Sequence, residues 1–139
     1  EEAFTVFYRA RNDVTLFADV LPVLQHLAAR YRLVALTNGN ACLTTIGIAA
    51  HFDAVLTATK LGAAKPDPAF FAGAIASVEL DPTTSLHIGD NPENDIEASA
   101  LAGFGTVWLN RAGAAWRLDS CRPDWELSTL SDLPELLQQ

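Results

Sequence analysis

Short apolar runs that alternate with helical patterns are the feature that most constrains the fold of this chain. A continuous or nearly continuous apolar run of this length is typical of a strand covered on both faces. The predicted strands are residues 33–36, 54–57, 85–88 and 106–109, with a short edge strand at 125–127. Because helical patterns separate the strands, we predict an α/β fold, a Rossmann-like parallel sheet with helices on both faces.

The helices are marked by their apolar spacing and their terminal residues. Asp19 is a predicted N-cap, the sequence Pro66-Asp67-Pro68 predicts the start of a helix that continues to about Val78, and Gly103 predicts a helix end. The remaining predicted helices are residues 3–11, 19–30, 41–48, 93–102 and a last one capped by Ser131 that ends near Leu137. Residues 4–8 of the first of these also suit a strand. This order leaves residues 110–124 as a loop.

Charge and cysteine content exclude several classes of protein. The formal net charge is −8, from nine basic and seventeen acidic residues, so the chain lacks the basic surface that nucleic acid requires. No apolar run reaches the length that spans a membrane. Cys42 and Cys121 lie far apart without metal-type spacing, which favours reduced thiols and a cytoplasmic location. An anionic small substrate would need a local cation or metal to offset the overall charge.

The strand at 85–88 is followed by two carboxylates that form the most informative candidate site. Asp90 comes directly after Gly89, and Asp95 follows at the start of a helical pattern. This spacing places both carboxylates around one strand-to-helix turn, where hard cations find oxygen ligands. We interpret Asp90 as a metal ligand and Asp95 as a supporting group that orients a metal-bound water or a cation. The alternative is that they are capping acids at a helix N-terminus.

Two further polar segments follow apolar runs. Thr37, Asn38 and Gly39 are candidates to hold phosphoryl oxygens at a helix N-terminus, although Asn-Gly also predicts a simple turn. Lys65 follows small apolar residues, where an ammonium needs a carboxylate or phosphate partner, although it could also be a surface lysine. Since ligands gather at the carboxyl ends of parallel strands, we expect these segments and Asp90 at one edge of the sheet.

The histidines and tryptophans carry no separate prediction of a site. The three histidines share no metal-ligand spacing, and His87, inside a predicted strand, is interpreted as a core residue with its polar groups satisfied. The tryptophans at positions 108, 116 and 125 are interpreted as packing residues.

In their order and spacing these motifs resemble the haloacid dehalogenase-like (HAD) hydrolase superfamily, in particular its phosphatase branch with a small helical cap. Leu36-Thr37-Asn38-Gly39 looks like the second family motif, Lys65-Pro66 like the third, and the segment from Gly89 to Asp95 like the fourth. The resemblance covers the chain from the helix at 19–30 onward and implies a HAD-like core.

The resemblance also implies a mechanism. A phosphatase of this family transfers the phosphoryl group of a small phosphorylated metabolite to an aspartate nucleophile, and water then hydrolyses the aspartyl phosphate. Asp90 would bind Mg²⁺ with support from Asp95, and Lys65 would neutralise the nucleophile and the transferring oxygens. Thr37 and Asn38 would hydrogen-bond the phosphoryl group.

The first family motif, Asp-x-Asp on the first strand, is absent from these residues. The resemblance therefore implies that residues 1–18 are the end of the cap region and its return linker, and that 19–139 are a core without its nucleophile strand. That strand would lie between the strands ending at Thr37 and Gly89, so we expect a catalytically inactive fragment. An incomplete core of this kind is expected to close the gap, swap segments or associate with another copy.

Two other functions stay open at this stage. One is a metal-independent 2-haloacid dehalogenase of the same fold, which the pair Asp90 and Asp95 disfavours because two carboxylates without Mg²⁺ would repel an anionic substrate. The other is a non-catalytic pseudoenzyme that binds a phosphorylated ligand or a partner chain, which the absent nucleophile motif favours.

Overall fold

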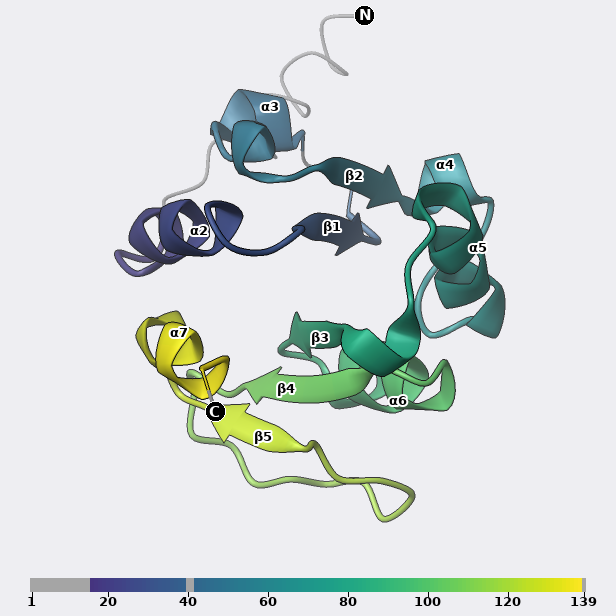
Figure 1. Cartoon of the computed structure of the whole chain (residues 1–139). Coiled ribbons are helices and arrows are strands. Elements are labelled where there is room, and N and C mark those ends of the chain that lie inside the picture. Colours follow the sequence, from purple (N-terminus) through teal and green to yellow (C-terminus); the bar gives the residue numbers. More distant parts are fainter. Residues whose placement is uncertain (1–15, 40–41, 139) are drawn as a thin grey trace, which may run out of the picture. The chain divides into compact units, whose positions relative to one another are not determined.

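The computed structural model describes residues 16–39 and 42–138, which divide between two compact units, Glu1–Thr57 and Ala58–Gln139 (Figure 1). The helix predicted at 3–11, and residues 1–15 of the cap segment predicted at 1–18, lie outside the described residues. Among the described helices, none is both long and apolar enough to cross a membrane.

The first unit is a pair of parallel strands with short helices. Strand β1 (Val34–Thr37) pairs with β2 (Ala54–Thr57) in a register that sets Thr37 opposite Thr57. Helix α2 (Val20–Ala28) buries Val23 and Leu27, as its apolar spacing predicts. Asp19 occupies the N-cap position, but its side chain makes no capping hydrogen bond. The remaining elements are α3 (Leu43–Ile46) and a 3₁₀ turn, η1 (Ala49–His51).

The second unit contains a three-stranded parallel sheet in the order β3-β4-β5. Its strands are β3 (Leu86–Gly89), β4 (Gly105–Leu109) and β5 (Trp125–Leu127). Its helices and turns are α4 (Ala58–Leu61), α5 (Pro68–Val78), η2 (Pro82–Thr84), η3 (Pro92–Glu97), α6 (Ala98–Leu101), η4 (Leu130–Asp132) and α7 (Leu133–Leu136). The predicted edge strand at 125–127 and the parallel α/β class are both confirmed.

The core of the second unit is built from apolar residues of its helices and of β4. The fully or almost fully buried side chains include Phe70, Phe71, Ala74, Ile96, Val107, Trp108 and Leu133. Helix α5 starts as the sequence predicts, because the Asp67 carboxylate accepts a hydrogen bond from the backbone N–H of Ala69 at 2.9 Å, and Pro68 fills the first turn. Gly103, with φ +96°, follows the end of α6 as predicted.

The helix predicted at 93–102 begins instead as a π-helix, η3, which continues into α6. The carbonyl oxygen of Asn91 accepts the N–H groups of both Asp95 (2.9 Å) and Ile96 (3.4 Å), so the first turn is wider than an α-turn. The last helix also starts differently: the hydroxyl of Thr129 caps the 3₁₀ turn η4, which contains Ser131, and Asp132 is at the N-cap position of α7 without a side-chain capping bond. Local signals located both helices, and the hydrogen-bond pattern of the turn decided how each begins.

The strands of the described residues form two sheets, and β1 is paired only with β2. The sequence-based hypothesis placed the absent nucleophile strand between the strands that end at Thr37 and Gly89, which are β1 and β3. This placement stays a prediction, because β1 and β3 belong to different units of the chain.

Candidate active site

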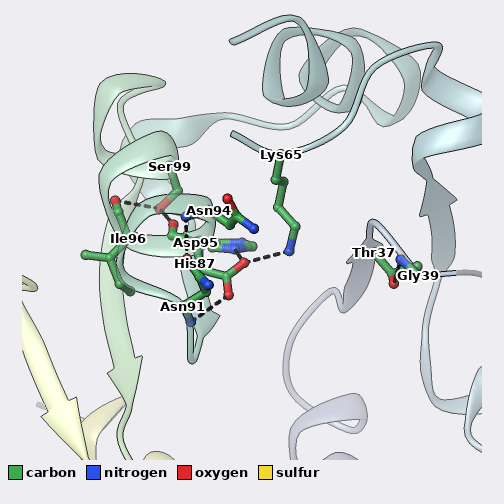
Figure 2. A network of polar contacts seen from close by, with 9 residues as sticks. All are labelled: Thr37, Gly39, Lys65, His87, Asn91, Asn94, Asp95, Ile96 and Ser99. Atoms are coloured by element: carbon green, nitrogen blue, oxygen red, sulfur yellow. Dashed lines mark hydrogen bonds and ion pairs between the residues drawn. The ribbon is translucent and has the colours of Figure 1, made fainter. Parts of the chain in front are cut away.

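An ion pair between Lys65 and Asp95 is the centre of the candidate site. The Lys65 Nζ lies 2.6 Å from Asp95 Oδ1, and the two side chains are only 11% and 8% exposed. Figure 2 shows the lysine reaching the carboxylate from the loop that precedes α5, while Asp95 stands on η3. Lys65 therefore has the carboxylate partner that its small, apolar sequence context predicted, and its charge is held where water is largely excluded.

Asp95 receives two further contacts from around the end of β3. The His87 Nε2 lies 3.4 Å from Asp95 Oδ1, and the backbone N–H of Asn91 donates to Asp95 Oδ2 at 3.1 Å. Asn91 is itself the N-cap of η3, because its side chain accepts the N–H of Asn94 at 2.9 Å. Asp95 thus caps the helix N-terminus, which was the alternative interpretation from the sequence, and it also binds Lys65.

Gly89 is required by Asp95. A Cβ at position 89 would overlap the Asp95 carboxylate, with the Oδ2 atom only 2.5 Å away. His87 and Gly89 share one face of β3, since residues two apart in a strand point the same way. The absence of a side chain at Gly89 therefore makes room for the Asp95 carboxylate.

The environment keeps Asp95 ionised. Burial raises the pKa of this carboxyl, but hydrogen bonds from His87 and Lys65, the charge of Lys65 and the backbone N–H of Asn91 together lower it well below its usual range. At neutral pH Asp95 is therefore a carboxylate. A charged lysine held in this way can neutralise a second anion that enters the site.

Asp90 differs from Asp95 because its side chain is exposed. Its backbone carbonyl accepts a hydrogen bond from the indole N–H of Trp108 at 2.9 Å. Within the described residues no group of three or more His, Cys, Asp or Glu side chains surrounds a possible metal position. The donor set fits Mg²⁺ nevertheless, because Mg²⁺ is commonly held by one or two carboxylates together with waters and substrate phosphate.

The segment Thr37–Gly39 belongs to the first unit and follows β1. The hydroxyl of Thr37 accepts a hydrogen bond from the backbone N–H of Gly39 at 2.9 Å, and Asn38 and Gly39 are exposed. This is the local turn that Asn-Gly predicts. Exposed amides of such a turn could still bind an anion, so its role in substrate binding stays a prediction.

The sequence did not identify two of the residues that fix Asp95. His87 is packed edge-on against Phe71, with ring centroids 5.2 Å apart, and its ring nitrogen faces Asp95. Ser99 is fully buried and donates its hydroxyl proton to the Asp95 carbonyl oxygen at 2.5 Å. The positions of His87, two residues before Gly89, and of Ser99, four residues after Asp95, were the available signals.

Comparisons with known proteins identify the family of this chain. Residues 2–103 match the family model described as haloacid dehalogenase-like hydrolase. The chain is 33% identical to phosphoserine phosphatase of Thermus thermophilus, over 79% of this chain and 47% of that protein. It is 31% identical to N-acylneuraminate-9-phosphatase of Rattus norvegicus, over 99% of this chain and 58% of that protein.

Among solved structures, the chain resembles a 2-haloacid dehalogenase from Pseudomonas syringae pv. Tomato DC3000, with a TM-score of 0.92 and 41% identity. That match covers 99% of this chain and 59% of the dehalogenase. The chain spans about half the length of the curated relatives it matches, at 47% and 58%. Because the family model matches residues 2–103, most of its length, the chain belongs to the haloacid dehalogenase-like hydrolases.

Proposed function

We propose that this chain supplies the metal-binding and charge-neutralising part of a Mg²⁺-dependent phosphatase that acts on a small phosphomonoester. The observation that carries the proposal is the ion pair of Lys65 with Asp95 at 2.6 Å, on the turn that also carries Asp90. The turn offers an exposed carboxylate for a cation, and beside it lies a fixed ammonium for an anion. The two phosphatases named above support the same reaction class.

Each residue has a distinct role in the proposed reaction. The Asp90 carboxylate would hold Mg²⁺, and Asp95 would hold Lys65 while its remaining lone pairs orient water near the metal. When bound, Mg²⁺ would offset the charge that develops on the transferring phosphoryl oxygens. Lys65 would neutralise the same oxygens, and Thr37 and Asn38 would donate hydrogen bonds to them.

The covalent step needs an aspartate nucleophile, and the Asp-x-Asp motif is not among these 139 residues. In the proposal, residues encoded upstream of Glu1 supply it, and the chain by itself hydrolyses no phosphomonoester. The same hypothesis predicts that the chain alone associates with itself through its open strand edges. Sedimentation velocity over a range of concentrations tests this, and a monomer at every concentration would contradict it.

The test of the function starts with the coding DNA upstream of Glu1. An in-frame strand with Asp-x-Asp should give an extended protein that releases phosphate from small phosphomonoesters with Mg²⁺ and loses this activity with a chelator. Asp90→Asn should lower the activity by at least about a hundredfold, as expected for a group that stabilises transition-state charge. Activity that survives the chelator would overturn the metal-dependent proposal. A stop codon would favour the non-catalytic pseudoenzyme.

A second candidate, metal-independent dehalogenation of a 2-haloacid, is favoured by the 41% identity to a dehalogenase structure. The objection that two carboxylates repel an anionic substrate is weaker in the structure, because Lys65 compensates the charge of Asp95. Two assays of the extended protein separate the two functions. Halide release from a 2-haloacid in the presence of chelator supports dehalogenation, and Mg²⁺-dependent phosphate release supports the phosphatase.

A further inference from the structure

The peptide group between Asp90 and Asn91 is hydrogen-bonded at both of its polar atoms. Its carbonyl oxygen accepts the indole N–H of Trp108 at 2.9 Å. Its N–H donates to Asp95 Oδ2 at 3.1 Å. A planar peptide that is fixed at both polar atoms cannot rotate without losing one of these bonds. The backbone that carries the Asp90 side chain is therefore tied to β4 on one side and to Asp95 on the other.

Trp108 is well placed to hold this peptide. In the parallel pairing of β3 with β4, it lies in register with Gly89, the residue immediately before Asp90. Trp108 is only 4% exposed, so its N–H bond to the Asp90 carbonyl is partly shielded from water. A hydrogen bond shielded in this way contributes more to positioning than one at the surface.

The loop that follows β4 fixes the Trp108 ring. Trp116 packs edge-on against Trp108 with ring centroids 5.0 Å apart, and its own indole N–H donates to the carbonyls of Leu118 at 2.9 Å and Cys121 at 2.8 Å. Arg117 in the same loop forms two hydrogen bonds with Glu93 of η3, one of them at 2.6 Å. The loop thus connects the indole that holds Asp90 to the helix that carries Asp95.

We propose that Trp108 is a positioning residue that, through the peptide between Asp90 and Asn91, orients the Asp90 carboxylate for a divalent cation. This inference rests on the proposed function and deepens it, since it assigns a role to a tryptophan outside the family motifs found in the sequence. The side chain itself touches neither substrate nor metal. Its N–H bond fixes the orientation of the peptide and therefore the direction in which the Asp90 side chain projects. The Asp95 carboxylate fixes the same peptide by accepting its N–H.

The test is divalent-cation binding by the 139-residue chain, measured with Mn²⁺ by electron paramagnetic resonance and with Mg²⁺ by competition. Trp108→Phe keeps an aromatic ring, although a smaller one, and loses the N–H. The Kd for Mg²⁺ should rise about tenfold, the lower end of the range for residues that support a metal ligand. A second variant carries at position 108 the tryptophan analogue in which sulfur replaces the indole N–H. It keeps the shape of the ring, so it should fold like the parent and show the same rise.

Trp125→Phe is the matched control, because Trp125 lies on the neighbouring strand β5 and is 42% exposed. It should leave the Kd unchanged. No Mg²⁺ binding by the parent, or an unchanged Kd in Asp90→Asn, would overturn the proposed metal site and this inference with it. Binding that is lost in Asp90→Asn but unchanged in the sulfur analogue would overturn the role of Trp108 alone.

Discussion

Two strand ends of this chain look alike in sequence and differ in structure. After β1, the Thr37–Gly39 turn is closed by one local bond between the Gly39 N–H and the Thr37 hydroxyl, and its tip is exposed. After β3, the turn from Gly89 to Asp95 holds a buried carboxylate that contacts a lysine 30 residues earlier in the chain. The first turn is a local structure, and the second depends on tertiary packing.

The difference teaches how far each turn depends on the rest of its unit. A turn closed by a bond between residues two apart can form in a short peptide. The β3 turn requires Lys65, His87 and the space above Gly89 at once, so removing one partner leaves a buried charge or a steric overlap. Substitutions should therefore be costly at the second turn and inexpensive at the first.

The largest expected effect comes from removing the lysine of the buried pair. Lys65→Ala leaves the Asp95 carboxylate buried with only the weaker His87 and Asn91 contacts, and should lower the free energy of unfolding by about 3 kcal/mol. Urea denaturation of the second unit measures this. Adding Asp95→Asn should restore part of the loss, because the uncompensated charge is then gone.

Lys60→Ala is the control for this experiment, since Lys60 is exposed on α4 and its removal changes the net charge by the same amount. Its effect should stay within about 0.5 kcal/mol, as for most surface substitutions. Equal losses for the two lysines would mean that the ion pair with Asp95 does not stabilise the unit.

Gly89→Ala should have the next largest effect. The added Cβ would overlap the Asp95 carboxylate, so the pair must move, at a cost of about 1–3 kcal/mol. Gly73→Ala provides the comparison, because its Cβ would meet only Leu61 at 3.4 Å, within a helix that alanine favours. Thermal unfolding of both variants measures the difference, and a similar change at both positions would show that Asp95 can leave its place without cost.

Most of the secondary structure of this chain could be predicted from the sequence, because it depends on local sequence signals. Four-residue apolar runs and the Pro66-Asp67-Pro68 signal depend on neighbouring residues, and the strands and α5 lie close to their predicted positions. The wide first turn of η3 was not readable, because it depends on which N–H groups share the Asn91 carbonyl. Propensity cannot distinguish an α-turn from a π-turn when the difference is one hydrogen bond.

The candidate site was readable only in part. Spacing placed Asp90 and Asp95 on one turn and predicted that Lys65 needs an anionic partner. It did not identify Asp95 as that partner, nor His87 as a second contact, since both depend on how α5 and β3 pack together. His87 is a core residue as predicted, but its ring nitrogen faces the carboxylate.

The pH dependence of stability in acid tests the contribution of the buried Asp95 carboxylate, and a smaller effect is expected. Because the folded pKa of Asp95 is depressed, its contribution to stability is complete above the unfolded value of about 3.9 and is lost as pH falls toward the folded value. One such group changes the free energy of unfolding by at most about 1.4 kcal/mol per pH unit. Between about pH 4 and pH 2, Asp95→Asn should therefore show a shallower loss of stability than the parent, and identical slopes would contradict the depressed pKa.

The smallest effect is expected at the β1 turn. Thr37→Val keeps the branched shape that suits a strand end and removes the hydroxyl that accepts the Gly39 N–H. Since Gly39 is exposed, water can replace this acceptor, and the free energy of unfolding should fall by less than about 1 kcal/mol. A loss of about 2 kcal/mol or more in urea denaturation would mean that the β1 turn, like the β3 turn, depends on tertiary packing. If Thr37 instead serves the proposed site, its cost should appear in ligand binding: inorganic phosphate should bind more weakly to Thr37→Val while stability hardly changes. The Thr37 hydroxyl would then contribute to substrate binding and little to the free energy of unfolding.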